Sequence, residues 1–201
     1  MFRGDKMTER MFRKKLLSAV PVETERLLLR NIQPEDANDM YEYASIPEVC
    51  EYLLWSPHVN VDATLGYIEF LQKRYLKGLY GDWAIVLKKE NKMIGTCGFA
   101  AIDSSTMTCE IGYVLSPKYR GNGYMTEAVN AVLELSFKKL GILNTELRII
   151  LQNESSVRLA ERVGFHLDRI GYSEMEIKGI ERDIAHYRMS YDEFIAKKEA
   201  V

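Results

Sequence analysis

A chain of 201 residues is long enough for one folded domain with a sizeable hydrophobic core. Hydrophobic residues make up 47% and charged residues 28%, as in ordinary globular proteins, and no apolar run is long enough to span a membrane. The formal net charge of −2 argues against nucleic acid as the main partner. The three cysteines lack the spacing of a zinc or redox site, and their odd number fits a reducing cytoplasm.

The first 21 residues are predicted to be an extension ahead of a domain formed by residues 22–201. Met7, Met11, Phe12 and Leu16 fall near one helical face, which would suit a short amphipathic helix. We expect this segment to be solvated or only loosely docked. A tail that binds nucleic acid or a membrane is the alternative.

The first half of the domain is predicted to contain one strand followed by helices. The strand covers residues 26–32, and the first helix opens at Pro34 with acidic residues in its first turn. Residues 46–54 are predicted to be helical, residues 54–58 a loop, and residues 62–77 a long helix. The apolar side of that long helix is predicted to consist of Leu65, Ile68, Phe70, Leu71 and Tyr75.

The second half reads as a meander of strands that leads into alternating helices and strands. The predicted strands are 82–89, 93–102, 108–115, 145–151, 167–177 and 180–190, with helices at 124–140 and 155–163. A strand, a crossover helix and a strand imply a parallel pair with a right-handed connection. The predicted fold is therefore mixed α/β: an antiparallel meander with one parallel pair at its centre, flanked by helices.

A basic glycine loop, Arg120-Gly121-Asn122-Gly123, lies between strand 108–115 and helix 124–140. The first N–H groups of a helix have no intrahelical acceptor and carry partial positive charge, so a phosphate or pyrophosphate is the expected ligand. A plain helix start with a solvated arginine is the alternative. The loop is not a P-loop, because Tyr124 follows its last glycine, and Thr126 stands where a dinucleotide fingerprint needs a small residue.

Residues 110–114 and 119–123 together resemble the acetyl-coenzyme A motif of the GNAT N-acetyltransferase superfamily. Residues 153–165, with an Asn-x-x-Ser start and a Gly-Phe end, resemble its second signature. Residues 153–165 and residues 23–30 are also similar to the ribosomal-protein-alanine N-terminal acetyltransferase branch of this superfamily. The resemblance implies that the parallel strands splay apart, so that backbone groups bind the pantetheine arm and polarise the thioester carbonyl. It implies acetyl-CoA as co-substrate and no metal.

The resemblance assigns coenzyme binding to the strand end, the loop, the helix start and one asparagine. These residues are Tyr113, Val114, Leu115, Arg120, Gly121, Asn122, Gly123, Tyr124, Met125, Thr126 and Asn153. An asparagine such as Asn153 also caps helices well, and both roles are compatible.

Two residues are candidates for catalysis. Glu110 is the expected base for the amine's proton; an ordinary strand glutamate, solvated or paired with a lysine, is the alternative. Ser156 is the expected donor to the departing sulfur, as its branch suggests, because many family members carry a tyrosine four positions later and this chain has Ala160. A plain helix-start serine is the alternative.

By analogy, Trp55, Pro57 and His58 roof the acceptor site, while core packing is the alternative for Trp55. An α-amine titrates at about 7.7–8.0 and a lysine at about 10.4, so one weak base suits a protein N-terminus better. The expected acceptor is a peptide N-terminus. A small amine (a polyamine, an amino acid or an aminoglycoside-like molecule) and a catalytically silent module that binds acyl-CoA are the alternatives. A homodimer is left open.

Overall fold

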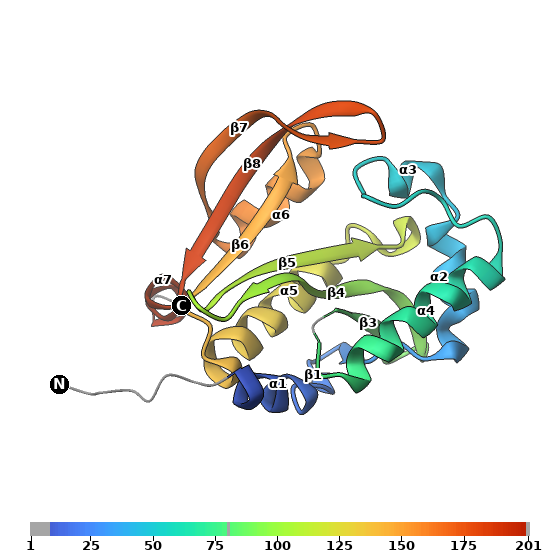
Figure 1. Cartoon of the computed structure of the whole chain (residues 1–201), viewed down its shortest axis with the longest axis horizontal. Coiled ribbons are helices and arrows are strands. Elements are labelled where there is room, and N and C mark those ends of the chain that lie inside the picture. The colour runs from blue at the N-terminus through green and yellow to red at the C-terminus, as the bar shows by residue number, and fades with distance from the viewer. Residues whose placement is uncertain (1–8, 80, 200–201) are drawn as a thin grey trace.

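The computed structural model describes residues 9–79 and 81–199, and these residues form an eight-stranded sheet (Figure 1). The strands lie in the order β1 (Val22–Glu23), β2 (Leu27–Arg30), β3 (Asp82–Leu87), β4 (Lys92–Asp103), β5 (Thr108–Leu115), β6 (Asn144–Ile150), β8 (Ile180–Ser190) and β7 (His166–Ile177). Neighbouring strands are antiparallel except β5 and β6, which run parallel. The predicted meander around one parallel pair is confirmed.

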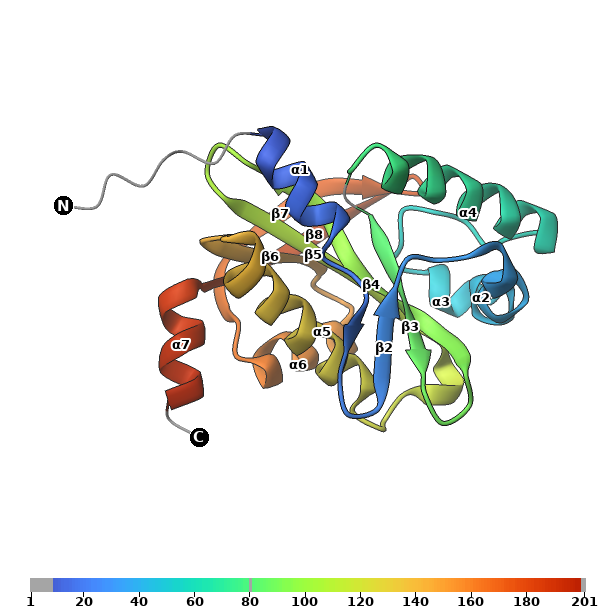
Figure 2. The ribbon, with the colours of Figure 1, turned by 90° about the horizontal axis from the view of Figure 1, so that it is seen from below.

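Helices cover both faces of this sheet (Figure 2). One face carries α1 (Glu9–Leu17), α5 (Tyr124–Glu134), α6 (Glu154–Val163) and α7 (Tyr191–Glu199); the other carries α2 (Ala37–Ala44), α3 (Pro47–Cys50) and α4 (Val61–Leu76). Because side chains alternate along a strand, the inner strands feed a larger hydrophobic core on the first face and a smaller one on the second. The sheet is thus the middle of three layers.

The parallel pair is short, and this positions the site. β5 and β6 pair only where residues 108–110 lie opposite residues 144–146. Beyond Glu110 the two strands diverge, so the edge of β5 from Ile111 to Leu115 faces a gap instead of a partner strand. This is the predicted splay.

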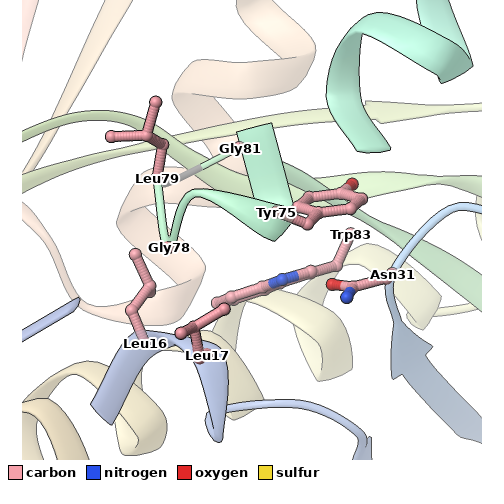
Figure 3. A pocket seen from close by; sticks show the side chains of 8 residues that line it. All are labelled: Leu16, Leu17, Asn31, Tyr75, Gly78, Leu79, Gly81 and Trp83. Carbon is pink, nitrogen blue, oxygen red and sulfur yellow. The ribbon is translucent and has the colours of Figure 1, made fainter. Parts of the chain in front are cut away.

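The helix α1 is packed more tightly than the sequence suggested. Phe12 and Leu16 are only 5% and 6% exposed and belong to the larger core. Figure 3 shows the indole of Trp83 lying between Tyr75 and the leucines of α1, beside a small pocket of about 20 Å³. The expectation of a solvated or loosely docked segment is therefore wrong for these residues, whereas Met7 lies outside the described residues.

Other differences lie at the ends and on the surface. The helix predicted for residues 46–54 covers only Pro47–Cys50, and neither β1 nor α7 was predicted. Phe70, expected on the buried side of α4, is 53% exposed and stacks on Tyr67 instead. An exposed aromatic at a helical spacing cannot be told from a core residue before the neighbouring elements are known.

Candidate active site

A large cleft opens between the N-terminal ends of α5 and α6 and the segment at α3. Its volume is about 1020 Å³, at the upper end of ordinary ligand pockets. Of the predicted coenzyme residues, those on its wall are Tyr113, Val114, Leu115, Arg120, Gly121, Gly123, Tyr124, Met125, Thr126 and Asn153. The sequence therefore located one wall of a real cavity.

The glycine loop has the geometry of an anion site. Gly121 and Gly123 have φ of 78° and 77°, a left-handed conformation that side chains disfavour. A Cβ on Gly121 would meet nothing within 4 Å, so conformation rather than space requires this glycine. The first helical bond of α5 runs from the Glu127 N–H to the Gly123 carbonyl, which leaves the N–H groups of residues 124–126 without an intrahelical acceptor.

Asn122 is the one predicted loop residue that does not line the cleft. Its amide Nδ2 instead donates to the carbonyl oxygens of Tyr119 and Arg120, at 3.3 and 3.0 Å. The Asn122 side chain therefore stabilises the backbone conformation of the loop and can affect a bound ligand only indirectly.

An ion pair that sequence reasoning missed holds this loop in place. Arg26 Nε donates to Glu127 Oε2 at 2.6 Å, and Arg26 Nη1 donates to the Asn122 carbonyl at 2.9 Å. The same guanidinium lies 4.7 Å from the centre of the Tyr124 ring. Thr24 Oγ1 and the Arg26 backbone N–H donate to the other carboxylate oxygen, at 2.6 and 2.9 Å. In the sequence, the only hint of this ion pair is the acidic residue Glu127 in the first turn of α5.

A smaller cavity, the splay pocket, fills the gap between β5 and β6. Its volume is about 190 Å³. Most of its side chains are apolar: Leu53, Leu54, Ile111, Leu147, Ile149, Ile150, Met175, Ile177 and Ile184. Its one carboxylate, Glu110, accepts from Arg148 Nε at 2.8 Å, and the two side chains are 17% and 40% exposed. The charges of this wall therefore cancel.

Tyr113, Asn153 and Ser156 line both cavities, so the large cleft and the splay pocket meet beside them. Asn153 caps α6, because its Oδ1 accepts from the Ser156 N–H at 3.3 Å, and the predicted cap is confirmed. The amide Nδ2 of the same side chain is the part that is free of the cap and suited to a ligand carbonyl. Glu110 reaches only the splay pocket, on the other side of this junction.

Trp55, Pro57 and His58 line neither cavity. Trp55 packs against the smaller core. His58 bonds Thr64 through Nδ1 at 2.8 Å, and burial lowers its pKa. The wall is formed a few residues earlier, by residues 52–54.

The tip of the β7–β8 hairpin reaches this same wall. Lys178 Nζ donates to the Cys50 carbonyl at 2.6 Å, and the guanidinium of Arg182 lies 5.9 Å from the centre of the Tyr52 ring. Two segments that are distant in the sequence, residues 50–52 and the hairpin tip, are therefore in contact beside the splay pocket.

A family model described as "Acetyltransferase (GNAT) domain" matches residues 26–166. The chain belongs to the GNAT acetyltransferase family. The uncharacterized N-acetyltransferase p20 of Bacillus licheniformis is 31% identical over 156 residues, which cover 78% of this chain and 88% of that protein. A GNAT acetyltransferase structure from Bacillus anthracis superposes with a TM-score of 0.76 at 25% identity, covering 85% and 98% of the two chains. The ribosomal-protein-S5-alanine acetyltransferase structure from Vibrio fischeri shares the fold, with a TM-score of 0.75 at 23% identity over 87% and 98%.

This GNAT protein is an acetyl-CoA-dependent N-acetyltransferase. The residues present fit the coenzyme, because the large cleft joins free helix N–H groups and Arg120 at one end to the splayed edge of β5 at the other. Within residues 9–79 and 81–199 there is no cluster of three or more histidine, cysteine, aspartate or glutamate side chains that would hold a metal. In the same residues, no helix combines the length and apolarity needed to cross a membrane.

Proposed function

We propose that this GNAT enzyme acetylates the α-amine at the N-terminus of a polypeptide. The observation that carries the proposal is the splay pocket, whose wall is mostly apolar and whose charged side chains, Glu110 and Arg148, form one ion pair. A polycation such as a polyamine needs an acidic cleft. The splay pocket has one acidic side chain, Glu110, and the positive charge of Arg148 beside it disfavours a polycation. A peptide N-terminus needs only one site for its amine and an apolar surface for its first side chain.

The protonation of the amine supports the same acceptor. At neutral pH roughly a tenth of free α-amines are neutral, against fewer than about one lysine side chain in a thousand. The difference costs a lysine acceptor on the order of 3–4 kcal/mol. A carboxylate is a weak base in general, which matches the amine that loses its proton more easily.

The proposed roles follow from the position of each group. Arg148 bonds one carboxylate oxygen of Glu110, Oε2, and we assign the other oxygen, Oε1, to receive the amine's proton. When bound, acetyl-CoA supplies the thioester, and its carbonyl oxygen gains negative charge as the amine attacks. The free edge of β5 near Val114 provides main-chain groups to stabilise that charge, and Ser156 donates a hydrogen bond to the sulfur.

A small amine is the second candidate. The spermidine N(1)-acetyltransferase of Escherichia coli is 20% identical over 171 residues, covering 84% of this chain and 88% of that protein. Spermidine, which that protein's name gives as its substrate, is a polyamine, and it would meet the Arg148 guanidinium beside Glu110 in this chain. A silent module that binds acyl-CoA is the third candidate, and it predicts coenzyme binding without turnover of any amine.

The test is a thiol-release assay with a matched panel. A peptide with a free N-terminus is compared with the same peptide blocked at its N-terminus and carrying one lysine, and with spermidine. We expect turnover of the free N-terminus only, and its loss in Glu110→Gln. Preference for the blocked twin or for spermidine would overturn the proposal. Calorimetric binding of acetyl-CoA with no turnover of any amine would establish the silent module instead.

A further inference from the structure

The hydroxyl of Tyr113 is buried and lacks a partner at the junction of the two cavities. Among the described residues, no hydrogen-bond partner lies within reach of its Oη in good geometry. Burial raises the pKa of Tyr113 to about 12, and the nearby hydroxyl of Ser156 opposes that rise. An unsatisfied buried hydroxyl destabilises the folded state, so its presence here calls for a reason.

The surroundings of Tyr113 supply that reason. On β5 its side chain lies on the face opposite Glu110, among the larger core, while both cavities reach the residue. Ser156 enters the same junction from the first turn of α6. A serine hydroxyl accepts and donates at once, so it can accept from a phenol while its own hydrogen points elsewhere.

We infer that Tyr113 is a positioning residue: with the coenzyme bound, its hydroxyl, which has no partner in this structure, donates to Ser156 Oγ and thereby directs the Ser156 hydrogen toward the departing sulfur. The inference rests on the role proposed above for Ser156. In that step the amine nitrogen bonds the carbonyl carbon as the carbon–sulfur bond breaks. The amine's proton passes to Glu110, and the sulfur leaves with the bonding electron pair as a thiolate, which the hydrogen bond from Ser156 stabilises.

Tyr113 does not itself transfer a proton. A thiol titrates near 8.5, so moving a proton from a group with a pKa near 12 to the thiolate is uphill by about 3.5 pKa units. The phenol therefore stays protonated throughout the working pH range and acts as a fixed donor. It follows that Tyr113→Phe leaves the shape of the pH–rate profile unchanged while lowering its height.

The test is a double-mutant cycle of Tyr113→Phe and Ser156→Ala, run with the amine that the wild-type enzyme acetylates best. Tyr43→Phe is the matched control, because the Tyr43 hydroxyl is also buried without a partner but lines neither cavity. For each variant kcat, KM, the melting temperature and the calorimetric Kd for acetyl-CoA are measured. The Kd reports coenzyme binding independently of activity.

We expect Tyr113→Phe to lower kcat about three- to tenfold, as for the loss of one hydrogen bond, with Kd and melting temperature little changed. In the Ser156→Ala background the same substitution should have no further effect, and Tyr43→Phe should leave kcat unchanged. The inference would be overturned if the double variant lost kcat by the product of the two single losses. It would also be overturned if Tyr113→Phe weakened acetyl-CoA binding and left kcat unchanged. An unchanged kcat in Ser156→Ala would overturn it too, while wild-type turnover of a free N-terminus would leave the proposed acceptor standing.

Discussion

Glu127→Gln tests whether the ion pair of Arg26 and Glu127, which lines the large cleft beside the glycine loop, prepares the coenzyme site. The carboxylate accepts from Thr24 Oγ1 and the Arg26 N–H through one oxygen and from Arg26 Nε through the other. A glutamine keeps the oxygen that accepts from Thr24 and the Arg26 N–H. Its amide nitrogen, however, is a donor and cannot accept from Arg26 Nε. The substitution therefore removes one charge-assisted bond and leaves the shape of the side chain unchanged.

The size of the effect follows from the exposure of the pair. A hydrogen bond to a charged group contributes about 1.5–3 kcal/mol, but the Arg26 side chain is 42% exposed, which reduces this to about 1 kcal/mol. We expect the free energy of unfolding to fall by about that amount. If the same contact holds the loop in its binding geometry, the Kd for acetyl-CoA rises about fivefold.

The pH dependence gives a second measurement. Burial alone would raise the pKa of Glu127, but the bonds from Thr24 and Arg26 together outweigh it and lower the pKa below 4.5. A depressed carboxyl pKa stabilises the folded state at neutral pH, and this stabilisation disappears as the carboxyl is protonated in the folded protein. The difference in unfolding free energy between wild type and Glu127→Gln should therefore shrink as the pH falls below 4.5.

Glu134→Gln is the control, measured by urea denaturation and calorimetry beside Glu127→Gln. Glu134 lies on the same helix and pairs with Lys138 at 3.2 Å and with Lys198, but it does not line the large cleft. Its substitution should change stability slightly and leave the Kd for acetyl-CoA unchanged. An unaltered Kd in a folded Glu127→Gln, or an equal loss in both variants, would refute the reasoning.

Three further outcomes are expected. Glu110→Gln should lower kcat at least about a hundredfold, the usual contribution of a general base, with the calorimetric Kd for acetyl-CoA unchanged. Asn153→Ala should lose about 1 kcal/mol of stability with the helix cap, whereas Asn153→Asp should keep the cap and the melting temperature but weaken acetyl-CoA binding, because it lacks the amide donor. Phe12→Ala should cost about 3 kcal/mol in urea denaturation; no loss would mean that α1 is not part of the core.

Features of this protein that depend on local rules could be predicted from the amino-acid sequence. The alternation of residues in β5 placed Glu110 opposite Tyr113, because successive strand residues point to opposite faces. Gly121 and Gly123 predicted a glycine loop ahead of α5, and the structure has a turn there with φ of 78° and 77°. The residue type of Asn153 predicted a helix cap, and its side chain caps the N-terminus of α6. In each case the information lies within a few residues of the position that it describes.

Contacts between residues that are distant in the chain depend on how the strands and helices are arranged in space. Arg26 and Glu127 are 101 residues apart, and Arg148 is 38 residues from the carboxylate that it neutralises. Neither pairing is visible until the order of the strands is known. Residues 52–54 rather than Trp55 likewise line the splay pocket, beside the contact of the hairpin tip at Lys178 with the end of α3. Periodicity fixes the face on which a side chain lies, whereas its partner depends on the packing of whole elements against one another.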